Sequence, residues 1–125
     1  MKDKKRLGDK GENYTISYLR SIGYEIVEVN YWCRYGEIDI VAIDRNDGHA
    51  KLVFVEVKAR KTIFFGMPEE AIARDKRVHM MKTIMHYLDN HNLIGSDIRI
   101  DVVGIQLNSF DEVEDLRHYR DVELF

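Results

Sequence analysis

Two apolar segments joined by a short polar turn constrain the fold of this chain most strongly. Residues 37–44 and 51–59 are rich in β-branched and other apolar side chains, and the six residues between them include the pair Asp47-Gly48. An Asp-Gly pair between apolar runs is a strong signal for a β-hairpin. We therefore expect two antiparallel strands whose register centres on Asp47 and Gly48.

Charged residues interrupt both strands at positions that share a face. Because alternate side chains of a strand point the same way, Glu56 and Lys58 lie together on the second strand, and Glu37 and Asp39 on the first. The expected register places Asp39 opposite Glu56 and Glu37 opposite Lys58. Directly paired residues have Cβ atoms about 4.5–5.5 Å apart, so two carboxylates would lie side by side with an ammonium group one pair away.

Paired carboxylates of this kind suit a divalent cation. Adjacent carboxylates repel each other, and Mg²⁺ favours sites with one or two carboxylates, several waters and a substrate phosphate. We expect Asp39, Glu56 and the backbone carbonyl of Val57 to bind Mg²⁺ or Mn²⁺. Lys58 would orient the attacking water or stabilise the transition state as a cation. Since Glu-Val-Lys is also common on solvent-facing strands, the aspartate of the neighbouring strand carries this prediction.

Glu12 adds a third carboxylate. It lies at the edge of the apolar stripe of a helix that the spacing predicts from Leu7 to Ile22. A supporting role in the site is one interpretation, and a favourable interaction with the positive end of the helix dipole is the other. Gly8 and Gly11 are unusual inside a helix, and close packing of the helix onto the sheet would explain them.

Four basic residues are candidates for contacts with nucleic-acid phosphates. Basic side chains bind phosphates without reading base sequence. The alternative for each of them is an ordinary solvated charge. The candidates near the strand ends and on the second helix are Arg34, Arg60, Lys61 and Lys76.

The remaining pattern predicts the order α-β-β-β-α-β in a single domain, 1–125. A strand is expected at 24–29, an irregular segment at 30–34, a second helix from about Pro68 to about His91, and a strand at 97–107. A long helix between two strands favours a parallel crossover. The acidic tail predicts a short strand or a helical turn. The fold class is therefore α/β, with a mixed sheet flanked by helices.

Composition limits the alternatives. The formal net charge of −3 means that a nucleic acid would bind through a local patch or a metal ion, since the chain is not strongly basic overall. No apolar run approaches the roughly 20 residues that span a bilayer. The basic N-terminus lacks the apolar segment of a secretory signal, and the single cysteine, Cys33, cannot form an internal disulfide. We expect a cytoplasmic protein.

Four motifs resemble the YraN family, a bacterial group within the PD-(D/E)xK nuclease superfamily. They are Gly-x-x-Gly-Glu at 8–12, GEIDIVA at 36–42, FVEVKAR at 54–60 and RIDVVGI at 99–105. The resemblance implies a restriction-endonuclease-like fold, similar to archaeal Holliday-junction resolvases. It also implies that Asp39 and Glu56 are metal ligands, Lys58 the catalytic lysine and Glu12 a supporting carboxylate. The superfamily's Pro-Asp is Ile38-Asp39 here.

We therefore expect a Mg²⁺- or Mn²⁺-dependent endonuclease that hydrolyses DNA phosphodiester bonds, with branched or processed DNA intermediates as substrates. DNA is favoured over RNA, and the similarity to resolvases favours a homodimer. The alternative is a non-catalytic nucleic-acid-binding or protein-interaction module that retains the nuclease fold. A nuclease that is active only with a partner chain is a third hypothesis.

Overall fold

The computed structural model describes the backbone of residues 2–61 and 74–125, and the side chains within those ranges from residue 8 onward. The expected order of elements is confirmed, and the acidic tail adds a further strand. In chain order the elements are α1 (Lys2–Ser21), β1 (Glu25–Cys33), β2 (Gly36–Asp44), β3 (Lys51–Arg60), α2 (Arg74–Asn90), β4 (Ile98–Leu107) and β5 (Val113–Tyr119). The part of the second helix predicted around Pro68 lies outside the described residues.

The strands form one mixed sheet with the spatial order β1-β2-β3-β4-β5. β3 and β4 are parallel, and the other neighbouring pairs are antiparallel. The parallel crossover and the β2–β3 hairpin are therefore both confirmed. The hairpin has the expected register, since Ile40 pairs with Val55 and Val41 with Phe54. Neither described helix is long and apolar enough to cross a membrane.

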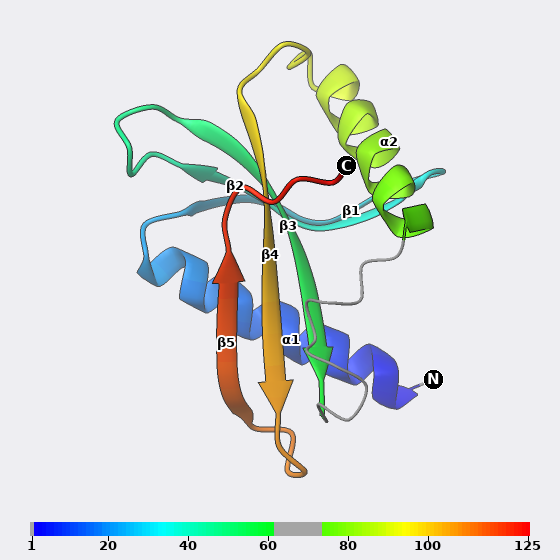
Figure 1. The fold of residues 1–125 in the computed structure, drawn as a ribbon, viewed down its shortest axis with the longest axis vertical. Coiled ribbons are helices and arrows are strands. Elements are labelled where there is room, and N and C mark those ends of the chain that lie inside the picture. The colour runs from blue at the N-terminus through cyan, green and yellow to red at the C-terminus, as the bar shows by residue number, and fades with distance from the viewer. Residues whose placement is uncertain (1, 62–73) are drawn as a thin grey trace.

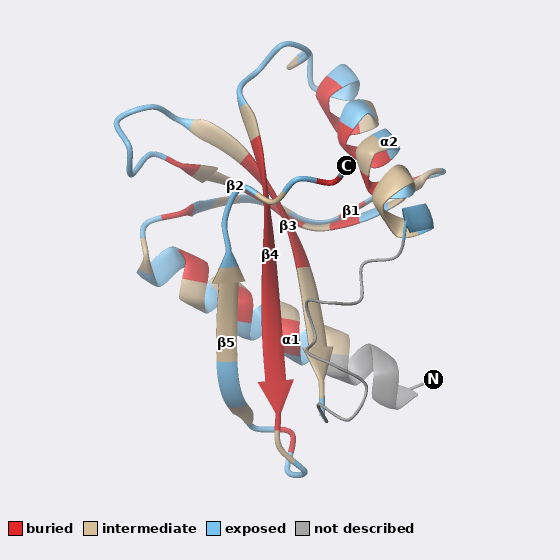
Figure 2. Cartoon of the chain, in the orientation of Figure 1, coloured by how far each residue is buried: buried red, intermediate tan, exposed pale blue. Residues whose placement is uncertain are grey.

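The helices cover opposite faces of the sheet (Figure 1). On the α1 side, Leu19 packs in a cluster with Val55, and on the α2 side Ile84 packs in a second cluster with Phe54. Burial of apolar surface between each helix and the sheet is the main force that holds these layers together. β4 is buried along almost its whole length because it has strands on both sides, whereas β5 at the sheet edge is mostly half-buried or exposed (Figure 2).

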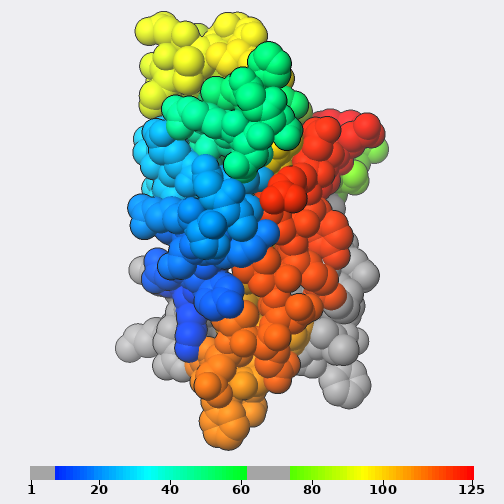
Figure 3. Space-filling view, turned by 90° about the vertical axis from the view of Figure 1, so that its left-hand side faces the viewer, coloured from blue at the N-terminus to red at the C-terminus, as the bar shows by residue number. Residues whose placement is uncertain are grey.

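α1 approaches the sheet most closely at Gly11. A Cβ atom added there would lie 2.9 Å from the Cβ of Ala59 on β3, so only glycine fits. The carbonyl of Gly11 accepts a hydrogen bond of 2.7 Å from the hydroxyl of the fully buried Thr15. The packing role predicted for Gly11 is therefore confirmed. The same prediction for Gly8 is not supported, because a Cβ added there would meet no atom of the described residues within 4 Å. Figure 3 shows the outer side of α1 beside β5.

β1 is longer than the sequence indicated. The prediction of an irregular segment at 30–34 is wrong for residues up to Cys33, which pairs with Gly36 of β2. Asn30 has a φ of 56°, in the left-handed region. Asparagine tolerates this conformation better than most residues. The strand therefore turns locally at Asn30 and resumes its pairing with β2 afterwards.

The strict alternation of side chains predicted for β2 is wrong around Asp39. Ile38 and Val41 both pack in the cluster on the α2 side, whereas Ile40 packs on the α1 side. Side chains two positions apart should share a face in a regular strand, so the strand twists between Ile38 and Ile40. As a result, the Asp39 carboxylate reaches toward the edge of β3.

Candidate functional site

The β2–β3 ladder opens at Asp39. The last pair of the ladder is Ile40 with Val55, but β3 continues to Arg60 and remains paired with β4. Asp39 Oδ2 accepts a hydrogen bond of 2.7 Å from the backbone N–H of Val57. The Asp39 carboxylate thus accepts the hydrogen bond that a backbone carbonyl of β2 would accept if the ladder continued. Neither of the expected pairs, Asp39 with Glu56 and Glu37 with Lys58, belongs to the ladder, because the ladder ends one pair earlier.

Glu56 lies deepest in this opening and is only 3% exposed. Its Oε1 atom is 3.7 Å from Lys58 Nζ on the same strand and 3.4 Å from Lys76 Nζ on α2. Its Oε2 atom is buried and receives no hydrogen bond from the residues that the structure describes, while its carboxyl group lies against that of Asp39. A buried carboxylate oxygen without a partner costs free energy, so this atom is a strong candidate to bind a cation or a proton.

Glu12 approaches the opening from the α1 side. With its amide nitrogen turned toward the acids, Asn30 donates hydrogen bonds of 2.7 Å to Glu12 Oε1 and 2.9 Å to Glu37 Oε1. The left-handed turn at Asn30 therefore places an amide between two carboxylates. Glu12, Asp39, Glu56 and Lys58 come from α1, β2 and β3, and the fold brings all four into one region.

Two acids of this region, Glu12 and Asp39, have raised pKa values. Burial raises the pKa of Asp39 well above its usual range, and the charges of Glu56 and then Glu12 raise it further, against the hydrogen bond from Val57. Burial also raises the pKa of Glu12 to about 7, and nearby acids add to this shift while the Asn30 amide opposes it. The metal-free cluster therefore retains protons near neutral pH. A divalent cation would compete with those protons, because metal ligands must be deprotonated.

The donors present fit a hard cation that keeps most of its waters. Among the described side chains, no three of the Asp, Glu, His or Cys type meet closely enough to hold one ion. Asp39 and Glu56 would thus supply two carboxylates, as Mg²⁺ and Mn²⁺ sites at phosphates commonly require. The N–H and C=O of one strand residue point to the same side. Because the Val57 N–H faces Asp39, its carbonyl also faces the opened edge.

The predicted phosphate-binding residues are placed unequally. Lys76 lies at the acid cluster, through its contact with Glu56. Lys61 forms an ion pair of 2.8 Å with Asp111, in the β4–β5 turn. Arg34 is exposed at the end of the β1–β2 hairpin, and Arg60 is half-buried at the end of β3. The sequence could not reveal the position of Lys76, because it depends on how α2 is rotated against the sheet.

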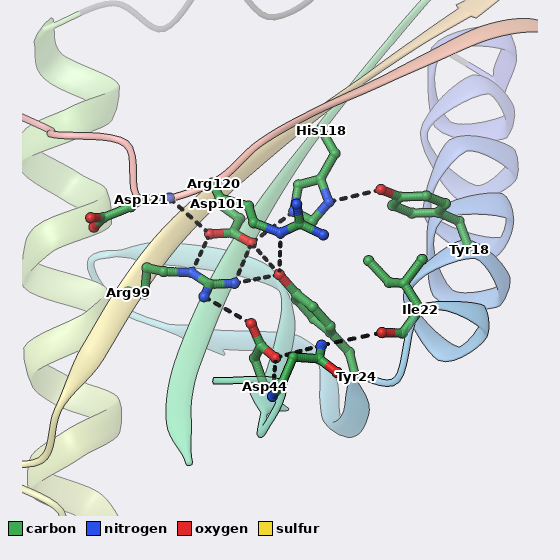
Figure 4. Close-up of polar contacts among 10 residues, drawn as sticks. Tyr18, Ile22, Tyr24, Asp44, Arg99, Asp101, His118, Arg120 and Asp121 are labelled. Atoms are coloured by element: carbon green, nitrogen blue, oxygen red, sulfur yellow. Dashed lines mark hydrogen bonds and ion pairs between the residues drawn. The ribbon is translucent and has the colours of Figure 1, made fainter. Parts of the chain in front are cut away.

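A second polar cluster surrounds Arg99 on β4 (Figure 4). Arg99 is 7% exposed and binds both carboxylate oxygens of Asp101, at 2.9 and 3.0 Å, and Asp44 at 2.8 Å. The Tyr24 hydroxyl donates to Asp101 at 2.9 Å and also contacts Arg99. His118 Nε2 lies 2.7 Å from Asp101. Each charge in this cluster therefore has a partner of opposite charge.

Pairing within the Arg99 cluster favours a structural role. Burial would raise the pKa of Asp101, but hydrogen bonds from His118 and Arg99 outweigh it and hold that pKa well below its usual range. Tyr18 extends the cluster to α1 through a 2.9 Å contact with His118. The cluster therefore links α1, the residue before β1, the end of β2, and strands β4 and β5. Sequence reasoning missed it, although the charges at Asp44, Arg99 and Asp101 inside apolar strands were a usable signal.

Comparisons with known proteins identify the family of this chain. The molecule is a mixed α/β protein with an acid and lysine cluster where a hairpin opens. Residues 11–105 match the model of a family described as "Uncharacterised protein family UPF0102". The chain therefore belongs to the UPF0102 family, which confirms the YraN-like family indicated by the sequence motifs.

Relatives of similar length share this family name. A UPF0102 protein of Caldicellulosiruptor saccharolyticus is 36% identical over 114 residues, which cover 91% of this chain and 93% of the relative. One from Sulfurihydrogenibium sp. is 41% identical and covers 90% of this chain and 94% of the relative. Another, from Syntrophus aciditrophicus, is 41% identical over 82% of this chain and 77% of its own length.

Proposed function

We propose that this protein is a Mg²⁺- or Mn²⁺-dependent nuclease that hydrolyses phosphodiester bonds of DNA, within the PD-(D/E)xK superfamily and similar to Holliday-junction resolvases. One observation carries the proposal. The carboxyl groups of Asp39 and Glu56 meet at the open end of the β2–β3 ladder, where one buried oxygen of Glu56 receives no hydrogen bond within the described part of the chain. Two lysines adjoin the same carboxylate. Carboxylates with nearby cations are the groups that metal-assisted phosphodiester hydrolysis requires.

Asp39, Glu56 and the Val57 carbonyl would hold the metal ion. A bound divalent ion lowers the pKa of a coordinated water and offsets the negative charge of the phosphate. Asp39 is oriented for this task by its hydrogen bond to the Val57 N–H, which fixes the carboxylate at the edge of β3. Glu56 is held by two lysines at Oε1, which leaves Oε2 available.

The two lysines have different exposure and are assigned different tasks. The Lys58 side chain is 25% exposed and lies on the same face of β3 as Glu56, so it orients the attacking water or stabilises the developing charge. The Lys76 side chain is 41% exposed and reaches in from α2, so it contacts a phosphate of the bound strand. Glu12 supports the cluster from α1 through the amide of Asn30.

The direct test is cleavage by the purified protein. Linear duplex, single-stranded and four-way-junction DNA are incubated with Mn²⁺, with Mg²⁺ or with a chelator, and the products are separated on denaturing gels. We expect metal-dependent cleavage, with the branched or single-stranded substrates cut fastest. An RNA strand of the same sequence measures the expected preference for DNA.

Variants separate this activity from a contaminating nuclease. Glu56→Gln and Lys58→Met should each lower the cleavage rate about 100-fold or more, with unchanged circular dichroism spectra. Glu114→Gln is the matched control, because Glu114 is exposed on β5, and it should cleave at the wild-type rate. Equal rates for all of these proteins would assign the activity to a contaminant and reject the proposal.

Metal binding distinguishes the non-catalytic alternative. Calorimetric titration with Mn²⁺ should give heat of binding for the wild type and none for Asp39→Ala. A wild-type protein that binds DNA without binding Mn²⁺ would instead be a nucleic-acid-binding module that retains the fold. The homodimer suggested by similarity to the resolvases stays a prediction, and sedimentation velocity tests it.

A further inference from the structure

A groove lies between α2 and the end of the β1–β2 hairpin, outside the acid cluster. Its volume is about 570 Å³, within the range of sites that bind small organic groups. Gly36 brings the hairpin close to the helix, because a Cβ added at Gly36 would lie only 3.3 Å from Thr83 Oγ1. Its lining includes Arg34, Tyr35, Lys82, Met85, Asp89 and Ile94.

One side of the groove is cationic and aromatic. The Arg34 guanidinium lies 4.8 Å from the centre of the Tyr35 ring and donates a hydrogen bond of 2.6 Å to the Tyr35 hydroxyl. Lys82 Nζ lies 5.9 Å from the same ring centre. Two cations beside one aromatic ring suit a ligand with a flat part that stacks and an adjacent anionic group that the cations attract. The acid Asp89 also lines the groove, but it lies roughly 10 Å farther along α2 than Lys82 and so leaves the cationic side positively charged.

The other side of the groove is apolar and exposed. Met85 is 47% exposed and Ile94 is 58% exposed. Methionine adapts its shape to flat ligands because its side chain is flexible and polarizable. A ligand that matches both sides has a planar body and an attached anion. An unpaired nucleobase with its phosphate has both features.

The groove and the acid cluster both border α2. Lys76 contacts Glu56 of that cluster, and His79 and Lys82 follow it at intervals of three residues on one ridge of the helix. Lys82 is six residues beyond Lys76, or about 9 Å along the helix axis. At about 3.4 Å per nucleotide, a stacked strand covers this distance in about three nucleotides.

We propose that this groove binds an unpaired nucleobase and its phosphate from the strand whose scissile phosphate enters the acid cluster. The location of the scissile phosphate rests on the proposed nuclease function, whereas strand binding in the groove does not. The substrate class is therefore nucleic acid with a single-stranded segment, such as a flap, an end or an open branch.

Strand binding is measured without metal, so that cleavage does not enter the result. Fluorescence anisotropy in a chelating buffer compares oligothymidylate with a strand of equal length that carries sugar and phosphate but no bases. The wild type should bind oligothymidylate about tenfold more tightly, because stacking of a base contributes about 1–3 kcal/mol. Equal affinity for the two strands would overturn the inference, since phosphate attraction alone would then explain binding.

Two exposed positions in the groove provide the variants, so that folding is preserved. Lys82→Glu and Met85→Glu should each weaken oligothymidylate binding about tenfold and remove most of the preference for bases. The controls carry the same new charge elsewhere: Arg20→Glu at the end of α1, and Phe110→Glu in the β4–β5 turn, where Phe110 is 80% exposed. Groove variants that bind like these controls would overturn the inference.

The outcome is separable from that of the nuclease proposal. A wild-type protein that never cleaves DNA but loses base preference in Lys82→Glu would reject the nuclease and support the groove. A protein that cleaves DNA through Glu56 but binds oligothymidylate and the strand without bases equally would support the nuclease and reject the groove. An oligouridylate arm shows whether the bound strand is DNA or RNA, and preference for bases in either supports the inference.

Discussion

The carboxylate of Asp39 accepts a 2.7 Å hydrogen bond from the backbone N–H of Val57, at the position where β2 and β3 stop pairing. This contact gives Asp39 a structural task in addition to the proposed binding of metal. It also explains how a strand edge buried in the molecule keeps its backbone donor paired.

Two substitutions at Asp39 separate these tasks. Asp39→Asn retains an oxygen for the Val57 N–H and removes one of the repelling charges, so the free energy of unfolding of the metal-free protein should be unchanged or higher. Asp39→Ala removes the acceptor and should cost about 1 kcal/mol or more. Both should abolish cleavage. Urea titrations monitored by circular dichroism measure the difference, and equal stability of the two variants would contradict the structural task.

The acid cluster should make the metal-free protein sensitive to pH. Because the pKa of Glu12 is raised from 4.5 to about 7 in the folded protein, its ionised form is disfavoured there relative to the unfolded chain. The stability that protonated Glu12 contributes is therefore fully present below pH 4.5 and is lost as the pH rises through about 7.

Glu12→Gln should flatten that part of the stability profile. Thermal unfolding in a chelating buffer between pH 4.5 and 8 measures it, and the melting temperature of the wild type should fall more steeply with rising pH than that of the variant. Asp39, whose pKa is also raised, should account for much of the remaining slope. Parallel profiles for wild type and Glu12→Gln would show that Glu12 is not desolvated by the cluster.

Two glycines of α1 should respond oppositely to the same substitution. Gly11→Ala places a methyl group 2.9 Å from the Ala59 Cβ, and should destabilise the protein by about 1–3 kcal/mol. Gly8→Ala places it inside a helix, more than 4 Å from every atom of the described residues, and should stabilise by about 0.5–1 kcal/mol. Melting temperatures of the two variants test the prediction, and a stabilising Gly11→Ala would contradict the close approach of α1 to β3.

The Arg99 cluster should contribute strongly to stability. Asp101→Asn removes the charge that Nε and Nη2 of Arg99 face and should cost about 3 kcal/mol, because a buried cation loses one of its two carboxylate partners. Asp115→Asn is the control, since Asp115 is 55% exposed and pairs with Arg117 at 3.6 Å, and should change stability by less than about 1 kcal/mol. Denaturant unfolding that gives similar losses for both would refute this role.

The fold could be predicted from the sequence to the extent that local signals set it. The Asp47-Gly48 turn fixed the register of β2 and β3, and the helix between β3 and β4 implied their parallel pairing. The turn of the chain at Asn30 could not be predicted, because a left-handed residue inside a strand depends on the paired strand and the packing around it.

The candidate site was predictable only in its residue types. Charges at Asp39, Glu56 and Lys58 within apolar strands indicated a shared site, because isolated charges are rarely buried there. The twist at Asp39 and the approach of Lys76 depend on tertiary packing, which no local pattern specifies.

Crystals soaked in Mn²⁺ test the central claim most directly, because Mn²⁺ is visible by anomalous scattering. We predict one strong anomalous peak within coordination distance of both Asp39 and Glu56, and its loss in crystals of Glu56→Gln. A wild-type crystal with ordered acids and no peak between them, or with manganese bound only elsewhere, would contradict the account.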